Sequence, residues 1–165
     1  MIIDGYDAIG AAAEEGERNG RGAFVDRWVT LAAAVRGWAV STPHEYALLY
    51  GSPVPGYRAP SDTIAPAQRV NSAALRVVTR GFTSGEIDAR PRVPMKRAVK
   101  ADLQNVRAVA PELPEEVAAR ALQAWSALFG SITWELFGHF TGVVSDFEAY
   151  SAHQARRAAT MLASP

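Results

Sequence analysis

The chain has 165 residues, 48% of them apolar, a size and composition that suit one globular domain with a real core. Seventeen basic and seventeen acidic residues give zero formal net charge, so the sequence lacks the overall positive field of a protein that grips bare DNA by its phosphates. The absence of cysteine excludes disulfides and thiol catalysis, and the three histidines, His44, His139 and His153, are scattered; we expect no metal site and no cofactor.

No apolar run reaches membrane-spanning length, and the amino terminus lacks the pattern of a signal peptide. We therefore expect a cytoplasmic protein that makes no contact with a membrane.

Helical spacing recurs along the chain and strand alternation does not, which predicts an all-α fold, an antiparallel bundle of about six to seven helices. A short first helix is expected within residues 4–18, ended by Gly20 and Gly22. The second helix is predicted from one continuous apolar stripe, spaced by four, three, four and three residues: Phe24, Trp28, Leu31, Val35 and Trp38.

A capping box is predicted at the start of the next helix, where the Thr42 side chain accepts from a backbone amide and Glu45 reaches back. Pro43 suits the first helical position, and the short helix is expected to run to Tyr50 and stop at Gly51. The following stretch should be an extended surface connection, because it holds four prolines: Pro53, Pro55, Pro60 and Pro66.

Two amphipathic helices are expected in the middle of the chain. The first starts near Pro66, closes at residues 83–85, and turns Val70, Ala74, Val77 and Val78 inward. The second spans roughly residues 94–108, with Met95, Val99, Leu103 and Val106 inward. Its outward Lys96, Arg97 and Lys100 are ordinary for a solvated helix face.

A long helix begins at Pro114 and includes AWSALFGSITWELFGHF, residues 124–140, which is apolar on two opposite faces. One face suits the chain's own core: Ala121, Trp125, Phe129, Ile132, Leu136 and Phe140. The other face alternates small residues with large aromatics: Gln123, Ala127, Gly130, Trp134, Phe137, Gly138 and Thr141. A chain this short has few spare helices to cover both faces, so a symmetric partner is favoured, with an intramolecular helix pair as the alternative.

A terminal helix to about Leu162 is predicted from a second capping box, formed by Ser145 and Glu148. Its stripe can pair with the small-residue face of the preceding helix: Phe147, Tyr150, Gln154, Ala158 and Met161. Together the two stripes form the predicted homodimer interface, a four-helix bundle across a two-fold axis.

The order of these features resembles a known family. The last two helices, the segment HEYALLYGSPVPGY and the pattern W-x-x-x-F-G from Trp125 to Gly130 together look like the effector-binding and dimerisation half of a TetR-family transcriptional regulator. The similarity is to the WHG subgroup and covers about residues 21–162. That subgroup has histidine where this chain has Phe129, so a ligand contact through that histidine is not implied here.

Such regulators begin with a three-helix head that carries a helix-turn-helix. Residues 1–20 cannot supply this head, and the resemblance makes them a remnant of the linking helix, followed by a ligand-binding and dimerisation domain over residues 21–165. We expect either a deliberately expressed C-terminal domain or a misassigned start codon, with DNA bound only through a missing amino-terminal head.

The resemblance implies a sensor that binds a small, largely apolar or aromatic effector in a cavity among the middle helices. The lining is expected from the inward stripes, although plain core residues show the same spacing. The candidates are Trp28, Leu31, Val35, Leu49, Val70, Ala74, Val77, Leu103, Trp125, Phe129 and Ile132.

Two alternatives have less support in the sequence. Glu135 and His139, four residues apart on a helix, are the best candidates for an acid-base pair, but a hydrogen bond on the helix surface accounts for them more simply, and we expect no catalytic site. The other alternative is a helical interaction module that binds a different protein and no ligand.

Overall fold

The computed structural model describes residues 1–52, 61–91 and 93–163, so Pro53, Pro55 and Pro60 of the expected surface connection lie outside the described residues. The described part contains seven α-helices, one short 3-10 turn at Ser61–Thr63 and no strand, which confirms the all-helical prediction. The helices are α1 (Ile2–Asn19), α2 (Phe24–Ser41), α3 (Pro43–Tyr50), α4 (Ile64–Thr83), α5 (Arg97–Val109), α6 (Glu115–Leu136) and α7 (Phe147–Ala163). In the part of the chain that the structure describes, no helix combines the length and the hydropathy of a transmembrane span.

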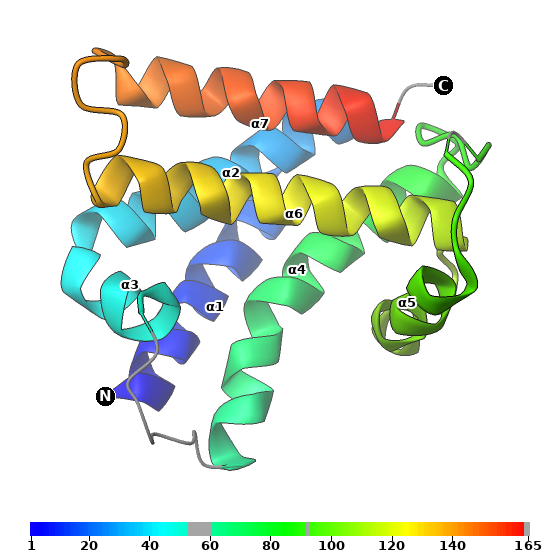
Figure 1. Ribbon diagram of the computed structural model, residues 1–165, viewed down its shortest axis with the longest axis horizontal. Coiled ribbons are helices and arrows are strands. Elements are labelled where there is room, and N and C mark those ends of the chain that lie inside the picture. Colours follow the sequence, from blue (N-terminus) through cyan, green and yellow to red (C-terminus); the bar gives the residue numbers. More distant parts are fainter. Residues whose placement is uncertain (53–60, 92, 164–165) are drawn as a thin grey trace.

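The last two helices form one side of the molecule. Figure 1 shows α6 and α7 lying side by side, with α2 behind them and with α1 and α4 on the opposite side. Helix α5 packs on α6 at the edge of the bundle. The core therefore lies between the α6/α7 pair and the α1/α4 pair, with α2 in contact with both pairs.

Helix α2 supplies the centre of that core. Its predicted stripe is confirmed, because Phe24, Trp28, Leu31 and Val35 are fully buried and Trp38 is half-buried. Burial on several sides explains why this helix is apolar on much of its circumference.

Helix α1 is longer than expected and is packed into the same core, with Ile9 and Ala13 fully buried. Gly16 allows α1 and α2 to approach closely, because a Cβ atom there would lie 2.8 Å from the Ala34 Cβ and 2.9 Å from the Leu31 Cα.

Ion pairs tie α1 to α4. Arg69 contacts Asp7 at 2.7 Å and Glu14 at 2.8 Å, and Arg76 contacts Glu17 at 2.6 Å. Since all three carboxylates belong to α1 and both arginines to α4, a displacement of one helix is resisted by the other.

Both predicted capping boxes are wrong in detail. The Thr42 hydroxyl donates to the carbonyl of Trp38 at 2.8 Å, so it satisfies the end of α2 and does not cap α3. Pro43 does occupy the first turn of α3, which ends at Tyr50 as expected. At the start of α7 the backbone N–H of Ala149 donates to Asp146, so the cap is Asp146 and not Ser145.

Two further predictions need correction. Helix α5 begins at Arg97, after Met95, and turns Leu103 inward while Val99 stays 45% exposed. Helix α6 ends at Leu136 and does not continue to Phe140, because Gly138 adopts a φ of +77° and turns the chain away from the helix axis.

Candidate functional site

The described structure contains a cavity of about 320 Å³ between α2, α4, α5 and α6, which we call the central cavity. Its lining is Trp28, Gln68, Asn71, Ser72, Ala74, Leu75, Val78, Asn105, Val106, Val109, Ala121, Leu122 and Trp125. The lining contains apolar side chains, three amides and one hydroxyl, and no charged side chain. Such a site suits a neutral, mostly apolar molecule, because a bound charge would have no counter-ion.

Three of the side chains predicted to contact a ligand line the central cavity: Trp28, Ala74 and Trp125. The other eight are placed outside its lining. Six of them are buried in the packed interior: Leu31, Val35, Val70, Val77, Leu103 and Ile132. Leu49 is half-buried, and its Cδ1 lies 3.2 Å from where a Cβ of Gly5 would stand.

Phe129, the last of the eight, belongs to an aromatic cluster beside the cavity. Its ring lies 4.7 Å from the Tyr50 ring and 4.8 Å from the Trp125 ring, centroid to centroid. The Tyr46 ring stacks at 6.4 Å, and its hydroxyl bonds to Thr133 at 2.8 Å. Burial raises the pKa of both Tyr46 and Tyr50, so both phenols stay neutral at physiological pH.

The polar part of the lining could not be found from apolar stripes alone. Gln68, Asn71 and Ser72 lie on one face of α4, beside its buried stripe, and Asn105 comes from α5. Asn71 and Ser72 follow Gln68 by three and four residues, a spacing that places all three on the same side of α4. This spacing is the signal in the sequence from which the polar part of the lining could have been found.

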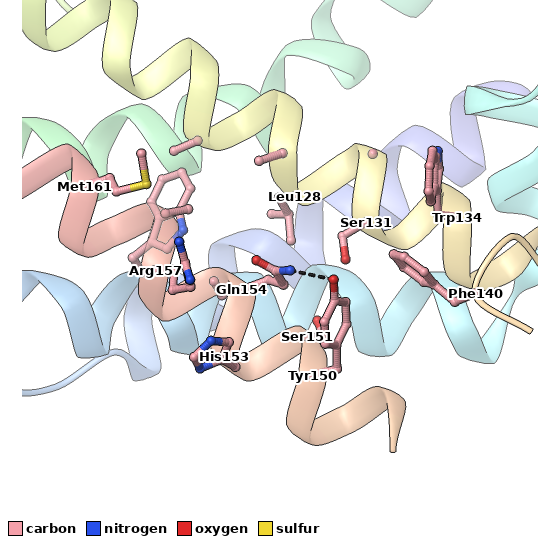
Figure 2. A pocket seen from close by; sticks show the side chains of 16 residues that line it. Leu128, Ser131, Trp134, Phe140, Tyr150, Ser151, His153, Gln154, Arg157 and Met161 are labelled. Atoms are coloured by element: carbon pink, nitrogen blue, oxygen red, sulfur yellow. Dashed lines mark hydrogen bonds between the residues drawn. The ribbon is translucent and has the colours of Figure 1, made fainter. Parts of the chain in front are cut away.

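A second depression, of about 820 Å³, follows the seam between α6 and α7, and we call it the α6/α7 groove. Figure 2 shows Leu128, Ser131 and Trp134 of α6 facing Tyr150, Gln154 and Met161 of α7, with a hydrogen bond of 2.6 Å from the Gln154 amide to the Tyr150 hydroxyl. Arg157 and His153 stand at its α7 side. Seven residues of the predicted dimer face line the groove: Ala127, Gly130, Trp134, Tyr150, Gln154, Ala158 and Met161.

The remaining residues of the predicted face lie outside the groove lining. Gln123 is exposed on α6, and Phe147 is half-buried at the start of α7. Phe137, Gly138 and Thr141 are exposed in the segment that follows α6 and not in the helix itself.

The α6/α7 face remains apolar and uncovered within the described part of the chain. Trp134 is 54% exposed and Met161 is 56% exposed, and Phe137 and Val143 add to the exposed apolar surface. Large exposed apolar patches are common at protein–protein interaction surfaces. The pairing of α6 with α7 does not by itself cover it.

Glu135 and His139 do not form the pair that the sequence suggested. The Glu135 carboxylate accepts two hydrogen bonds from Arg36 of α2, at 2.6 and 2.8 Å, and these hydrogen bonds raise the pKa of Arg36. His139 follows the end of α6, and its ring lies 5.6 Å from the Trp134 ring. In the described residues, no group of three or more potential metal ligands comes together.

Comparison with known proteins identifies the family. The family described as tetracyclin repressor-like, C-terminal domain, matches residues 28–158. This chain belongs to that TetR C-terminal family. The resemblance inferred from the sequence is confirmed, and the family is one of transcriptional regulators.

Curated relatives of this TetR-type domain are longer proteins. This chain is 33% identical over 147 residues to the HTH-type transcriptional regulator Rv1816 of Mycobacterium tuberculosis and to the HTH-type transcriptional regulator Mb1846 of Mycobacterium bovis. Each alignment covers 85% of this chain and 61% of the relative, so the chain spans about three fifths of their length.

Solved structures support the same fold. SCO4313, described as a regulatory protein, is 29% identical with a TM-score of 0.68, over 95% of this chain and 69% of that one. A Rhodococcus sp. RHA1 protein of unknown function has a TM-score of 0.71 at 19% identity, over 99% of this chain and 70% of that one, and bears on the fold alone.

Proposed function

We propose that this chain is the ligand-sensing and dimerisation domain of a TetR-like transcriptional regulator, active in the cytoplasm. The observation that carries the sensing role is the central cavity, an uncharged space of about 320 Å³ among four helices. A cavity of roughly 150 Å³ accommodates benzene, so this one has room for a neutral molecule of about two to three rings.

The proposal assigns DNA contact to a different part of the regulator. The curated relatives are described as HTH-type regulators, and this chain corresponds to 61% of their length. The formal net charge of zero supports this division, because a protein that holds DNA through its phosphates needs a positive surface. Residues 1–20 would then be the end of a linking helix, and residues 21–165 the sensing and dimerising unit.

The ion pairs between α1 and α4 give this sensor a physical route for its signal. One face of α4 lines the central cavity through Ala74 and Leu75, and the same helix holds α1 through Arg69 and Arg76. An effector that displaces α4 therefore also displaces α1, whose far end would carry the head.

Ligand binding is tested with N-phenyl-1-naphthylamine, a neutral dye that fluoresces in apolar sites. We expect saturable binding, and we expect Ala74→Phe to weaken it at least tenfold, since this substitution places a ring in the cavity. Ala33→Phe, on an exposed position of α2, is the matched control. Equal affinity in both variants, with unchanged circular dichroism, would overturn the proposed cavity and favour an interaction module without a ligand.

Dimerisation is proposed through the α6/α7 face, because this face is apolar, exposed and lined by small residues that allow a second copy to approach. Gly130 offers a clean test, since a Cβ there meets no atom within 4 Å. Gly138 does not, because its φ of +77° makes any replacement strained.

We expect Gly130→Arg to yield a folded monomer in light scattering coupled to size exclusion, because the new side chain blocks close approach. Gly37→Arg is the matched control, since Gly37 is exposed in α2 and its Cβ also meets nothing within 4 Å. A wild-type dimer that survives Gly130→Arg would refute this interface.

A further inference from the structure

The polar atom of Trp28 is buried without a partner. Trp28 is 1% exposed and lines the central cavity, and its indole Nε1 has no hydrogen-bond acceptor among the described residues. An unpartnered buried N–H group is costly, and native structures contain few of them. A phenylalanine would fill much of the same space without this cost.

Another buried polar ring nearby is treated differently by the fold. The Tyr46 hydroxyl, on a fully buried side chain, bonds to the Thr133 hydroxyl at 2.8 Å and to the Phe129 carbonyl at 3.2 Å. The core therefore satisfies Tyr46 with two hydrogen bonds and leaves the Trp28 indole N–H with none.

The other polar groups of the central cavity are also available. The amides of Gln68, Asn71 and Asn105 are exposed, and no hydrogen bond within the described part of the chain holds them. Trp28 therefore brings one unpartnered N–H donor to the buried end of the lining, and because this atom is fully enclosed, an acceptor reaches it only when the ring shifts. The exposed side offers three adaptable amides that can donate or accept.

We infer that the effector is a neutral molecule of about two to three rings that carries a hydrogen-bond acceptor, such as a ketone or ring ether oxygen, bound to the Trp28 Nε1–H. This inference rests on the proposed sensing function and adds the chemical class of the effector. A carboxylate is disfavoured because no basic side chain lines the central cavity, and a plain hydrocarbon would leave the indole N–H unsatisfied.

Trp28 also reaches the wall of the α6/α7 groove, so the test must separate the two spaces. Ala74→Phe obstructs the central cavity alone, since Ala74 is absent from the groove lining. Gly130→Arg obstructs the groove alone, since Gly130 is absent from the cavity lining.

The probes are 2-acetylnaphthalene, which carries a carbonyl acceptor, and 2-ethylnaphthalene, which has nearly the same shape without one. We expect the ketone to bind wild-type protein about three- to tenfold more tightly, the range for one net hydrogen bond. Trp28→Phe should abolish this preference while both probes still bind, and Gly130→Arg should preserve it.

Nuclear magnetic resonance gives a direct reading of the donor. The chain has four tryptophans, and the indole N–H signal that disappears in Trp28→Phe belongs to Trp28. We expect the ketone to move this signal downfield and the hydrocarbon not to do so.

Each other outcome overturns the inference in a recognisable way. If the ketone and the hydrocarbon bound the wild type equally and Ala74→Phe still abolished binding, the central cavity would remain the effector site. The effector would then make no hydrogen bond to Trp28. A ketone preference that survives Ala74→Phe and disappears in Gly130→Arg would place the acceptor in the α6/α7 groove. Failure of both naphthalenes, while N-phenyl-1-naphthylamine still binds, would refute the effector class and leave the sensing function intact.

Discussion

The ion pair between Arg36 and Glu135 joins the end of α2 to the end of α6 and offers a quantitative test of the structure. The two side chains are only 17% and 11% exposed, and the contact is two-pronged, through Nε at 2.8 Å and Nη2 at 2.6 Å. Removing one partner leaves a charge that is largely shielded from water. We therefore expect Glu135→Leu to lower the free energy of unfolding by about 3 kcal/mol, the lower end of the range for breaking a buried pair.

Removing both partners should cost far less. In the double variant Arg36→Met, Glu135→Leu, no charge is left unpaired and the space stays filled, so we expect a loss within about 1 kcal/mol of wild type. The coupling energy from the double-mutant cycle is then about 2 kcal/mol or more.

Urea unfolding followed by circular dichroism measures these differences, at one fixed protein concentration because the stability of the proposed dimer would depend on it. Glu15→Leu is the control, since Glu15 is an exposed helical carboxylate, and its effect should stay within about 0.5 kcal/mol. The buried ion pair would be refuted if Glu135→Leu lowered the free energy of unfolding no more than this control does. It would also be refuted if the loss in the double variant equalled the sum of the losses in the two single variants. Strong coupling of Glu135 to His139 would instead restore the pair suggested by the sequence.

Two further predictions concern close packing and acid stability. Gly16→Ala should lower the free energy of unfolding by about 1–3 kcal/mol, because its Cβ would lie 2.9 Å from the Leu31 Cα. Gly37→Ala should raise the free energy of unfolding by about 0.5–1 kcal/mol, because Gly37 is an open helical site. Thermal melts that show Gly16→Ala stabilised or Gly37→Ala destabilised would contradict this reasoning. Although burial opposes it, hydrogen bonds from Arg27, Ser84 and a backbone N–H lower the pKa of Glu86 from 4.5 to about 2. Because the folded-state pKa is the lower one, this stabilisation is present above about pH 4.5 and is lost as the pH falls towards 2. The difference between the urea midpoints at pH 3 and pH 7 should therefore be smaller in Glu86→Gln than in the wild type, and an unchanged pH dependence would exclude Glu86 as a source of acid lability.

Helix positions could be predicted because burial repeats with the helical period. The stripe from Phe24 to Val35 is fully buried in the structure, as its spacing required. Helix ends were less predictable, since the Thr42 hydroxyl could form a hydrogen bond with the preceding or with the following helix. In the structure it donates to the Trp38 carbonyl of the preceding helix. The end of α6 depended on the φ of Gly138, which a helical projection does not contain.

The central cavity could be predicted only in part, because a cavity is a space that packing leaves unfilled. The inward stripes include Trp28, Ala74 and Trp125, which line the central cavity, but they also include Leu31 and Val35, which pack fully in the core. The polar lining depends on how α4 and α5 face each other, and the Arg36–Glu135 pair joins residues 99 positions apart. No local spacing encodes such a contact.

The position of Trp28 on α2 has a consequence for how the two proposed roles would combine. Trp28 lines both the central cavity and the α6/α7 groove, so one side chain borders both the proposed effector site and the proposed dimer face. If an effector shifts this ring, the groove changes shape, and the affinity of one copy for the other changes with it. Linkage then requires the reverse effect, since dimerisation must alter effector affinity by the same factor. A rigid Trp28 would remove this direct coupling and leave the α4 to α1 ion pairs as the route between effector and DNA.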